Sequence, residues 1–182
     1  MHISVPTIII GLMLSPVSAL ADTDWMGGAS QWSVGFVDGP DKPYCRLYWD
    51  SELGKTMEFR QSLTDIVWLV AKNTWDIPEG TKTEVTITNR SNIEKVPAEF
   101  FDKNTLRLWP ASDDTGTAAI KALVKRSFAG TPDLQISFAG DESDWTLPFS
   151  RVEQLYSTYI KCLNRLRVTG QAKADSETTK PF

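Results

Sequence analysis

The sequence predicts an α+β domain in which about seven short strands form an antiparallel sheet, with two late helices packed on it and one disulfide bond. Three observations support this prediction. Apolar residues alternate with polar ones over much of the chain before residue 110, which is the period of half-buried strands. Helical spacing of apolar residues is found only in two later segments. The two cysteines, Cys45 and Cys162, lie near opposite ends of the patterned region.

The first predicted strands cover residues 32–36, 44–49 and 57–60, where apolar side chains alternate with polar or small ones. In the second strand the alternation separates two sets of three residues, which are Cys45, Leu47 and Trp49, and Tyr44, Arg46 and Tyr48. Because the cysteine must point inward to reach a helix in the core, the second set should face outward.

The next segment, residues 66–71 (IVWLVA), is a continuous apolar run and is typical of a central strand buried on both faces. Shorter strands are expected around residues 85–87, 106–108, 134–138 and 145–149. The acidic segment 141–144 between the last two should be a solvated hairpin tip.

Two helices complete the domain. The first is expected at residues 117–129, where apolar residues recur at helical spacing before Gly130. For the second, Ser150 and Glu153 predict a capping box ahead of a periodic run that ends at Leu166. After residue 168 the composition becomes polar without periodicity, so residues 169–182 should form a disordered tail and residues 22–168 a single domain.

The N-terminus has the pattern of an export signal. Residues 5–14 are apolar, and Ala19-Leu20-Ala21 fits the small-x-small cleavage rule, so we predict a signal peptide at residues 1–21. The apolar stretch is shorter than the about 20 residues that cross a bilayer, and no later run approaches that length. We therefore expect a periplasmic or secreted protein that is soluble and not transmembrane after cleavage.

Export also makes a disulfide bond between the two cysteines the expected state. An even pair in an oxidising compartment is interpreted first as a disulfide, so we predict that Cys45 pairs with Cys162. Closing so long a loop would stabilise the fold by roughly 5 kcal/mol in the chain-entropy model. No Cys-x-x-Cys motif points to a redox role instead.

Composition excludes several functions. The 19 Lys and Arg against 23 Asp and Glu give a net charge of -4, which provides no basic footprint for nucleic acid. The one histidine, His2, lies in the predicted signal peptide, so the mature chain would lack the usual general base and zinc ligand. Nucleophile arrangements of the Ser-His and Cys-His type are excluded with it. We expect no enzyme of these classes, no catalytic motif, no metal site and no cofactor.

Seven tryptophans raise the question of aromatic binding sites. Four of them follow the apolar phase of strands and should be core residues, namely Trp32, Trp49, Trp68 and Trp145. Trp75 and Trp109 lie at element edges beside prolines, where they could cover the core or form a ligand platform. The place of Trp25 is left open, because it precedes any periodic element.

The outward set Tyr44, Arg46 and Tyr48 is the strongest candidate binding site. Two amphipathic rings flanking a guanidinium match the residue types that anchor protein interfaces. The alternative is a cross-strand ladder that only covers the second face of the sheet.

The later part of the chain contains the segment Ile77-Pro78-Glu79-Gly80, the helix through Ile120 and Leu123, the strands from Leu134 to Phe149, and the helix from Val152 to Leu163. The order of these elements resembles that of the small exported proteins of the invasion-associated locus B type. The resemblance implies an envelope protein of β-rich fold with no known catalytic centre.

These observations favour a non-enzymatic exported module that binds another protein or an envelope component, with its oligomeric state open. A histidine-free hydrolase or isomerase is one alternative, and it requires a pair of carboxylates in a pocket with a raised pKa. The candidate carboxylates are Asp38, Asp50, Asp65, Asp113, Asp114 and Asp144. A second alternative is a small-ligand binder that uses Trp75 or Trp109 to hold envelope sugars or lipids.

Overall fold

The computed structural model describes residues 23–39, 42–90, 92–110, 114–130 and 132–178. The predicted signal peptide, residues 1–21, and the last four residues of the predicted tail lie outside the described residues. No helix in the described ranges is both long enough and apolar enough to cross a membrane.

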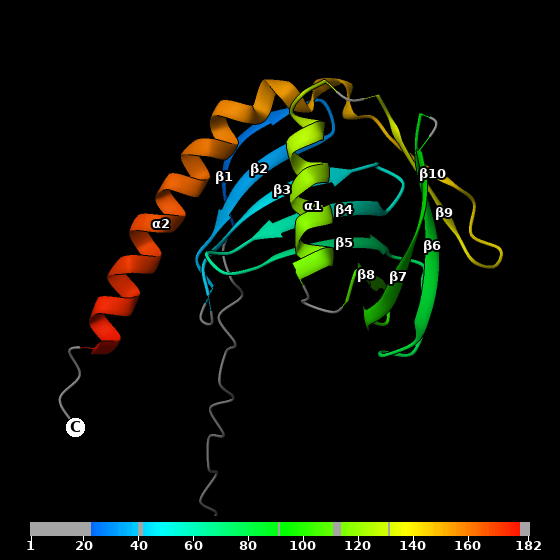
Figure 1. Cartoon of the computed structure of the whole chain (residues 1–182), viewed down its shortest axis with the longest axis horizontal. Helices are drawn as coiled ribbons and strands as arrows, with labels where there is room; N and C mark the ends of the chain where they lie inside the picture. The colour runs from blue at the N-terminus through cyan, green and yellow to red at the C-terminus, as the bar shows by residue number, and fades with distance from the viewer. Residues whose placement is uncertain (1–22, 40–41, 91, 111–113, 131, 179–182) are drawn as a thin grey trace, which may run out of the picture.

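The described chain forms one ten-stranded sheet, a 3-10 helix and two α-helices (Figure 1). The strands are β1 (Thr23–Ala29), β2 (Trp32–Val37), β3 (Tyr44–Asp50), β4 (Lys55–Gln61), β5 (Ile66–Lys72), β6 (Lys82–Asn89), β7 (Asn92–Asp102), β8 (Thr105–Leu108), β9 (Leu134–Phe138) and β10 (Trp145–Leu147). The helices are α1 (Asp114–Ser127), the 3-10 helix η1 (Phe149–Leu155) and α2 (Tyr156–Thr178). The antiparallel α+β class is confirmed, but the expected number of about seven strands is too low.

The strands pair antiparallel in the order β1-β2-β3-β4-β5-β8-β7-β6-β9-β10. Two of them, β1 and β7, have no clear signal in the sequence. A bulge between Trp25 and Gly27 shifts the phase of β1. The first four residues of β7 are all exposed, so no alternation marks this end of the strand.

The sheet has two different faces. Both α-helices pack on the face that carries Cys45, Leu47 and Trp49, which we call the helix face, and the core lies between them and the sheet. Figure 1 shows α1 crossing in front of β3, β4 and β5, and it shows β6 and β7 standing at a steep angle to β1–β5. The opposite face, which carries Tyr44, Arg46 and Tyr48, is called the outer face.

The predicted disulfide is present. Cys45 of β3 and Cys162 of α2 are bonded, with their Cα atoms 5.9 Å apart, and both residues are fully buried. The bond fastens α2 to the middle of the first half of the sheet. The four tryptophans assigned to the core are also confirmed, since Trp32, Trp49, Trp68 and Trp145 are all at most 4% exposed.

The start of the last helical region differs from the prediction. The Ser150–Glu153 capping box is wrong, because Phe149–Leu155 is a 3-10 helix that follows Pro148 and has no side-chain cap. Its buried residues, Phe149, Val152 and Leu155, recur every three positions, which is the period of a 3-10 helix. The α-helix begins only at Tyr156.

The end of that region differs too. A disordered tail from residue 169 is wrong for residues 169–178, because α2 continues to Thr178. This segment contains alanine, lysine, glutamine and glutamate, which have high helix propensity, so it extends the helix without an apolar stripe.

Gly170 of this helix packs closely against the β4–β5 turn, because a Cβ atom at this position would overlap the Leu63 side chain.

Candidate binding surface on the outer face

Strand register gathers the predicted binding residues on one side of the sheet. Arg46 of β3 lies opposite Gly35 of β2 and Arg60 of β4, and Tyr48 lies opposite Glu58. Trp25 of the edge strand β1 lies opposite Gly35. We call the resulting set the outer-face ladder, and it consists of Trp25, Tyr44, Arg46, Tyr48, Glu58 and Arg60.

The charged members of the ladder form one ion network. Arg46 Nη2 donates a hydrogen bond to Glu58 Oε2 at 3.0 Å. The Nε atoms of Arg46 and Arg60 both lie 3.0 Å from Glu58 Oε1, but their N–H groups are not aligned for hydrogen bonds. These two contacts are therefore ion pairs that stabilise by the attraction of opposite charges. Glu58 is only 5% exposed, and two cations against one anion leave the network with a net charge of +1.

Aromatic rings flank both guanidinium groups. The Arg46 guanidinium carbon lies 5.1 Å from the Trp25 ring centroid and 4.5 Å from that of Tyr48, and Arg60 lies 5.4 Å from the Tyr44 ring. Each such cation–π contact is worth about 0.5–1 kcal/mol at an exposed site. The rings therefore hold the arginines in place and also shield them from water.

Gly35 makes room for Trp25 in this arrangement. A Cβ atom on Gly35 would lie 2.7 Å from Thr23 Cγ2 and 3.1 Å from Trp25 Cε3, which is too close for ordinary contact. Glycine at this position lets the indole lie close to the strand, beside Arg46 and 5.8 Å from the Tyr48 ring centroid. The edge strand β1 is fixed to the ladder in this way.

The pKa values of two ladder residues, Tyr48 and Arg60, are raised. Burial would lower the pKa of Arg60, but the Glu58 carboxylate raises it above its usual value. Burial also raises the pKa of the Tyr48 phenol, and the negative charge of Asp50 adds to that effect. Both shifts favour the protonated form, so Arg60 stays a charged guanidinium and Tyr48 a neutral phenol.

Trp25 is the most exposed member of the ladder. It is 50% exposed, whereas the Arg46 side chain is 16% exposed. No helix of the described chain packs on the outer face. A partner would meet a preformed surface of rings and guanidinium edges that needs little ordering.

The structure brings Tyr44, Arg46 and Tyr48 to one face as expected, and it shows the cross-strand ladder that was the alternative interpretation. Binding by these residues stays a prediction. The sequence pattern does not predict that Trp25, Glu58 and Arg60 belong to this surface. Alternation does place Glu58 and Arg60 on the face opposite Met57 and Phe59, but only the strand register shows that both reach Arg46.

Trp75 lies apart from the ladder, in the connection between β5 and β6, and is partly buried against the core. Its Nε1 donates a hydrogen bond to Glu142 Oε2 at 3.1 Å. Lys72 Nζ and Trp145 Nε1 also donate to Glu142, at 2.6 and 3.0 Å. The expectation of a fully solvated tip at residues 141–144 is therefore wrong for Glu142, whose side chain is only 13% exposed.

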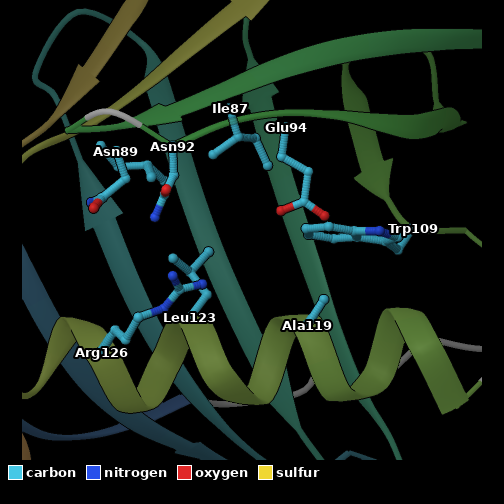
Figure 2. Close-up of a pocket in the computed structure, with 9 residues that line it drawn as sticks. Ile87, Asn89, Asn92, Glu94, Trp109, Ala119, Leu123 and Arg126 are labelled. Atoms are coloured by element: carbon cyan, nitrogen blue, oxygen red, sulfur yellow. The ribbon is translucent and has the colours of Figure 1, made fainter.

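Trp109 lies on a different groove, between α1 and the β6–β7 hairpin (Figure 2). Its ring lies 5.9 Å from that of Trp68 and so covers part of the core. Figure 2 shows the Glu94 carboxylate beside the Trp109 ring and the Arg126 side chain below Asn92. The groove volume is about 50 Å³, which suits a few water molecules rather than an organic ligand.

The alternative of a catalytic carboxylate pair concerns the residues that line the cavities of the described chain. The Trp109 groove and the cavities lined by Trp75, by Tyr159 and by Phe101 have no aspartate in their linings. Among the aspartates proposed for a catalytic pair, Asp113 lies outside the described residues. Within the described ranges, no group of three or more His, Cys, Asp or Glu residues is arranged to hold a metal ion.

Comparison with known proteins adds no relative. No protein-family model, no curated protein and no solved structure matches this chain.

Proposed function

We propose that this protein is a non-enzymatic exported module that binds another protein or an envelope component through the outer-face ladder. The observation that carries the proposal is the half-exposed Trp25 ring, which is held against Arg46 on a sheet face without a helix. Trp, Tyr and Arg are the residue types that most often dominate the binding energy of interfaces.

The rigidity of the ladder supports the same proposal. Arg46 is held by Glu58 and by two rings, so a partner would not have to order a long flexible side chain. The net charge of +1 on the network favours a partner surface that contributes an acidic or planar polar group. The predicted export signal and the disulfide are consistent with an envelope or extracellular partner.

The test is partner capture with matched variants. Wild-type protein, Trp25→Ala and Tyr44→Ala are immobilised and exposed to an extract of the periplasm, and the captured proteins and lipids are quantified. Tyr156→Ala is the control, because Tyr156 is also an exposed aromatic residue (55%) with one aromatic neighbour but lies on α2.

We expect a captured component to fall by about tenfold or more with the ladder variants and to stay unchanged with Tyr156→Ala. Near-ultraviolet circular dichroism of each variant shows that the fold is intact. Equal capture by all folded variants would refute the proposal, and loss with Tyr156→Ala alone would move the interface to the helix face.

A further inference from the structure

A cavity of about 210 Å³ lies on the helix face, at the end of the sheet away from the ladder. Its walls come from four strands, through Val85 of β6, Phe100 of β7, Leu106 of β8 and Phe138 of β9. Register places these side chains on one face, since the β6 residue lies opposite the β9 residue and the β7 residue opposite the β8 residue. Trp75 completes the wall from the connection between β5 and β6. We call this space the Trp75 cavity.

The wall formed by Trp75 is held in place by other rings. Trp75 meets Phe100 and Phe138 edge-on, with ring centroids 5.6 and 5.5 Å away. Its indole also stacks on Trp145, with centroids 5.5 Å apart. Because ring edges and ring faces attract one another, a wall built from rings favours an aromatic ring as the ligand.

Strand alternation separates two neighbouring residues of β6 at the cavity. Thr83 lies opposite Ala98 and shares the helix face with Val85. Lys82 is exposed and lies opposite Glu99, so its side chain belongs to the outer face and we assign it no role in binding. The partly buried Thr83 hydroxyl makes no hydrogen bond to any other residue of the described chain. This hydroxyl is therefore available to one polar group of a ligand.

The charged groups beside Trp75 neutralise each other. Glu142 Oε2 accepts hydrogen bonds from Lys72 and from the Trp75 indole N–H, and Oε1 accepts one from Trp145. Lys72 Nζ lies 2.6 Å from the carboxylate, so the two charges form an ion pair. A charged ligand of either sign would lose its hydration without gaining an unpaired counter-charge from the described residues of this wall. The cavity therefore favours a neutral molecule.

The volume limits the size of that molecule. An apolar protein cavity of about 150 Å³ accepts benzene, which has six heavy atoms. By the same ratio, 210 Å³ accommodates about eight heavy atoms. This is one ring with one or two small substituents, and it is too little for a long acyl chain.

We propose that the Trp75 cavity binds a small neutral phenol or aromatic alcohol, with its ring against Trp75 and its hydroxyl group hydrogen-bonded to Thr83. This site is independent of the outer-face ladder, which lies on the other face of the sheet. Trp25→Ala, which tests the ladder, should bind such a molecule as the wild-type protein does, so the two proposals can fail separately.

The experiment uses para-cresol as the probe and the Trp75 indole N–H resonance as the reporter. That resonance is assigned by its absence in Trp75→Phe. We expect para-cresol to shift it saturably in the wild-type protein with a Kd of about 1 mM or tighter. The Trp25 indole resonance should not move, because Trp25 lies on the other face.

Two charged molecules test the preference for a neutral ligand. Benzoate and benzylammonium carry the same ring with an anionic and a cationic group. We expect each of them to bind about tenfold more weakly than para-cresol, or weaker still.

Thr83→Val tests the hydrogen bond, because it replaces the hydroxyl by a methyl group of similar size. This variant should bind para-cresol about fivefold more weakly than the wild type. Its affinity for toluene, which has the same ring but no hydroxyl, should stay within about twofold of the wild-type value.

Two further variants of β6 locate the site. Thr83→Phe places a ring in the cavity and should weaken para-cresol binding by about tenfold or more. Thr86→Phe is the matched control, because Thr86 is also partly buried on β6 but is not part of the cavity lining. It should leave the Kd within about twofold.

Four results would overturn the proposal. Para-cresol could leave the Trp75 resonance unmoved in the wild-type protein. It could bind Thr83→Phe as tightly as the wild type while that variant is folded, which would place the bound molecule elsewhere. Either charged molecule could bind as tightly as para-cresol, which would refute the selection of a neutral ligand. Thr83→Val could change the affinities for para-cresol and toluene by the same factor, which would refute the role of the hydroxyl.

Discussion

Arg46 and Glu58 are joined by two contacts of 3.0 Å on a sheet face that no helix of the described chain covers. An ion pair on an uncovered face is usually worth little, because water screens it. Here Trp25, Tyr48 and the neighbouring strands exclude water, and Glu58 is 5% exposed. The pair therefore behaves as a partly buried one, and its removal has consequences for stability.

Glu58→Gln should lower the free energy of unfolding by about 2 kcal/mol or more, because it leaves the two arginines without a counter-charge. The measurement is urea denaturation at neutral pH. Glu84→Gln is the control, since Glu84 pairs with Lys95 at 3.1 Å while both side chains are more than half exposed. It should cost less than about 0.5 kcal/mol. Equal effects of the two substitutions would contradict the proposed burial of the network.

Gly35→Ala tests the fit of Trp25 on the sheet. Strand propensity alone would make alanine more stable than glycine by about 0.5–1 kcal/mol. We expect the opposite sign, a loss of about 1–2 kcal/mol, because the new Cβ atom meets Thr23 and Trp25. Thr23→Ser removes the nearest atom, Cγ2, so the double variant should recover part of the loss. Stabilisation by Gly35→Ala alone would show that β1 does not hold Trp25 as described.

Glu142→Gln should change how stability depends on pH. Burial alone would raise the pKa of Glu142, but hydrogen bonds from Lys72, Trp145 and Trp75 outweigh it and lower the pKa below the usual 4.5. A carboxyl group with a lowered pKa in the folded state stabilises the fold above its unfolded pKa, and this contribution is lost as pH falls through the folded value.

Thermal unfolding measured between about pH 6 and pH 3 checks that prediction. The wild-type protein should lose more stability over this range than Glu142→Gln, and Asp141→Asn, which changes an exposed carboxyl group beside it, should follow the wild type. Parallel curves for the wild type and Glu142→Gln would show that the Lys72 and tryptophan contacts do not stabilise the ionised form.

Replacing both cysteines by alanine should lower stability by about 2–4 kcal/mol, since the bond closes a long loop. The sequence separation of 117 residues places this disulfide near the upper end of the entropic effect. Reduced wild-type protein should unfold at the same urea concentration as the double variant. Free thiols at Cys45 and Cys162 in peptides of non-reduced protein from an oxidising compartment would disprove the pairing.

The disulfide and the core tryptophans could be predicted because each depends on a local pattern. Cys45 alternates with outward residues in its strand, and Cys162 lies on an apolar helical stripe, so both point to the interior. The central strand β5 has an uninterrupted apolar run that needs no partner for its recognition. The sequence predicts elements with such patterns at nearly the positions that they have in the structure.

The ladder could not be predicted in full, because its contacts depend on register between strands. Glu58 is 12 residues from Arg46, and only the pairing of β3 with β4 brings them together. Trp25 is in a strand whose bulge and glycines hide its period. Two of the three donors to Glu142, Lys72 and Trp75, lie 70 and 67 residues away in the sequence, so no local pattern predicts these contacts.

The disulfide also decides how the chain would respond to mechanical force. Residues 163–178 of α2 lie beyond Cys162, and Figure 1 shows the last turns of this helix extending past the strands. A pull on the C-terminal end could unwind those turns, but at Cys162 the load would pass through the covalent bond into β3, in the interior of the sheet. The force would then act on the strand that carries Tyr44, Arg46 and Tyr48 of the outer-face ladder.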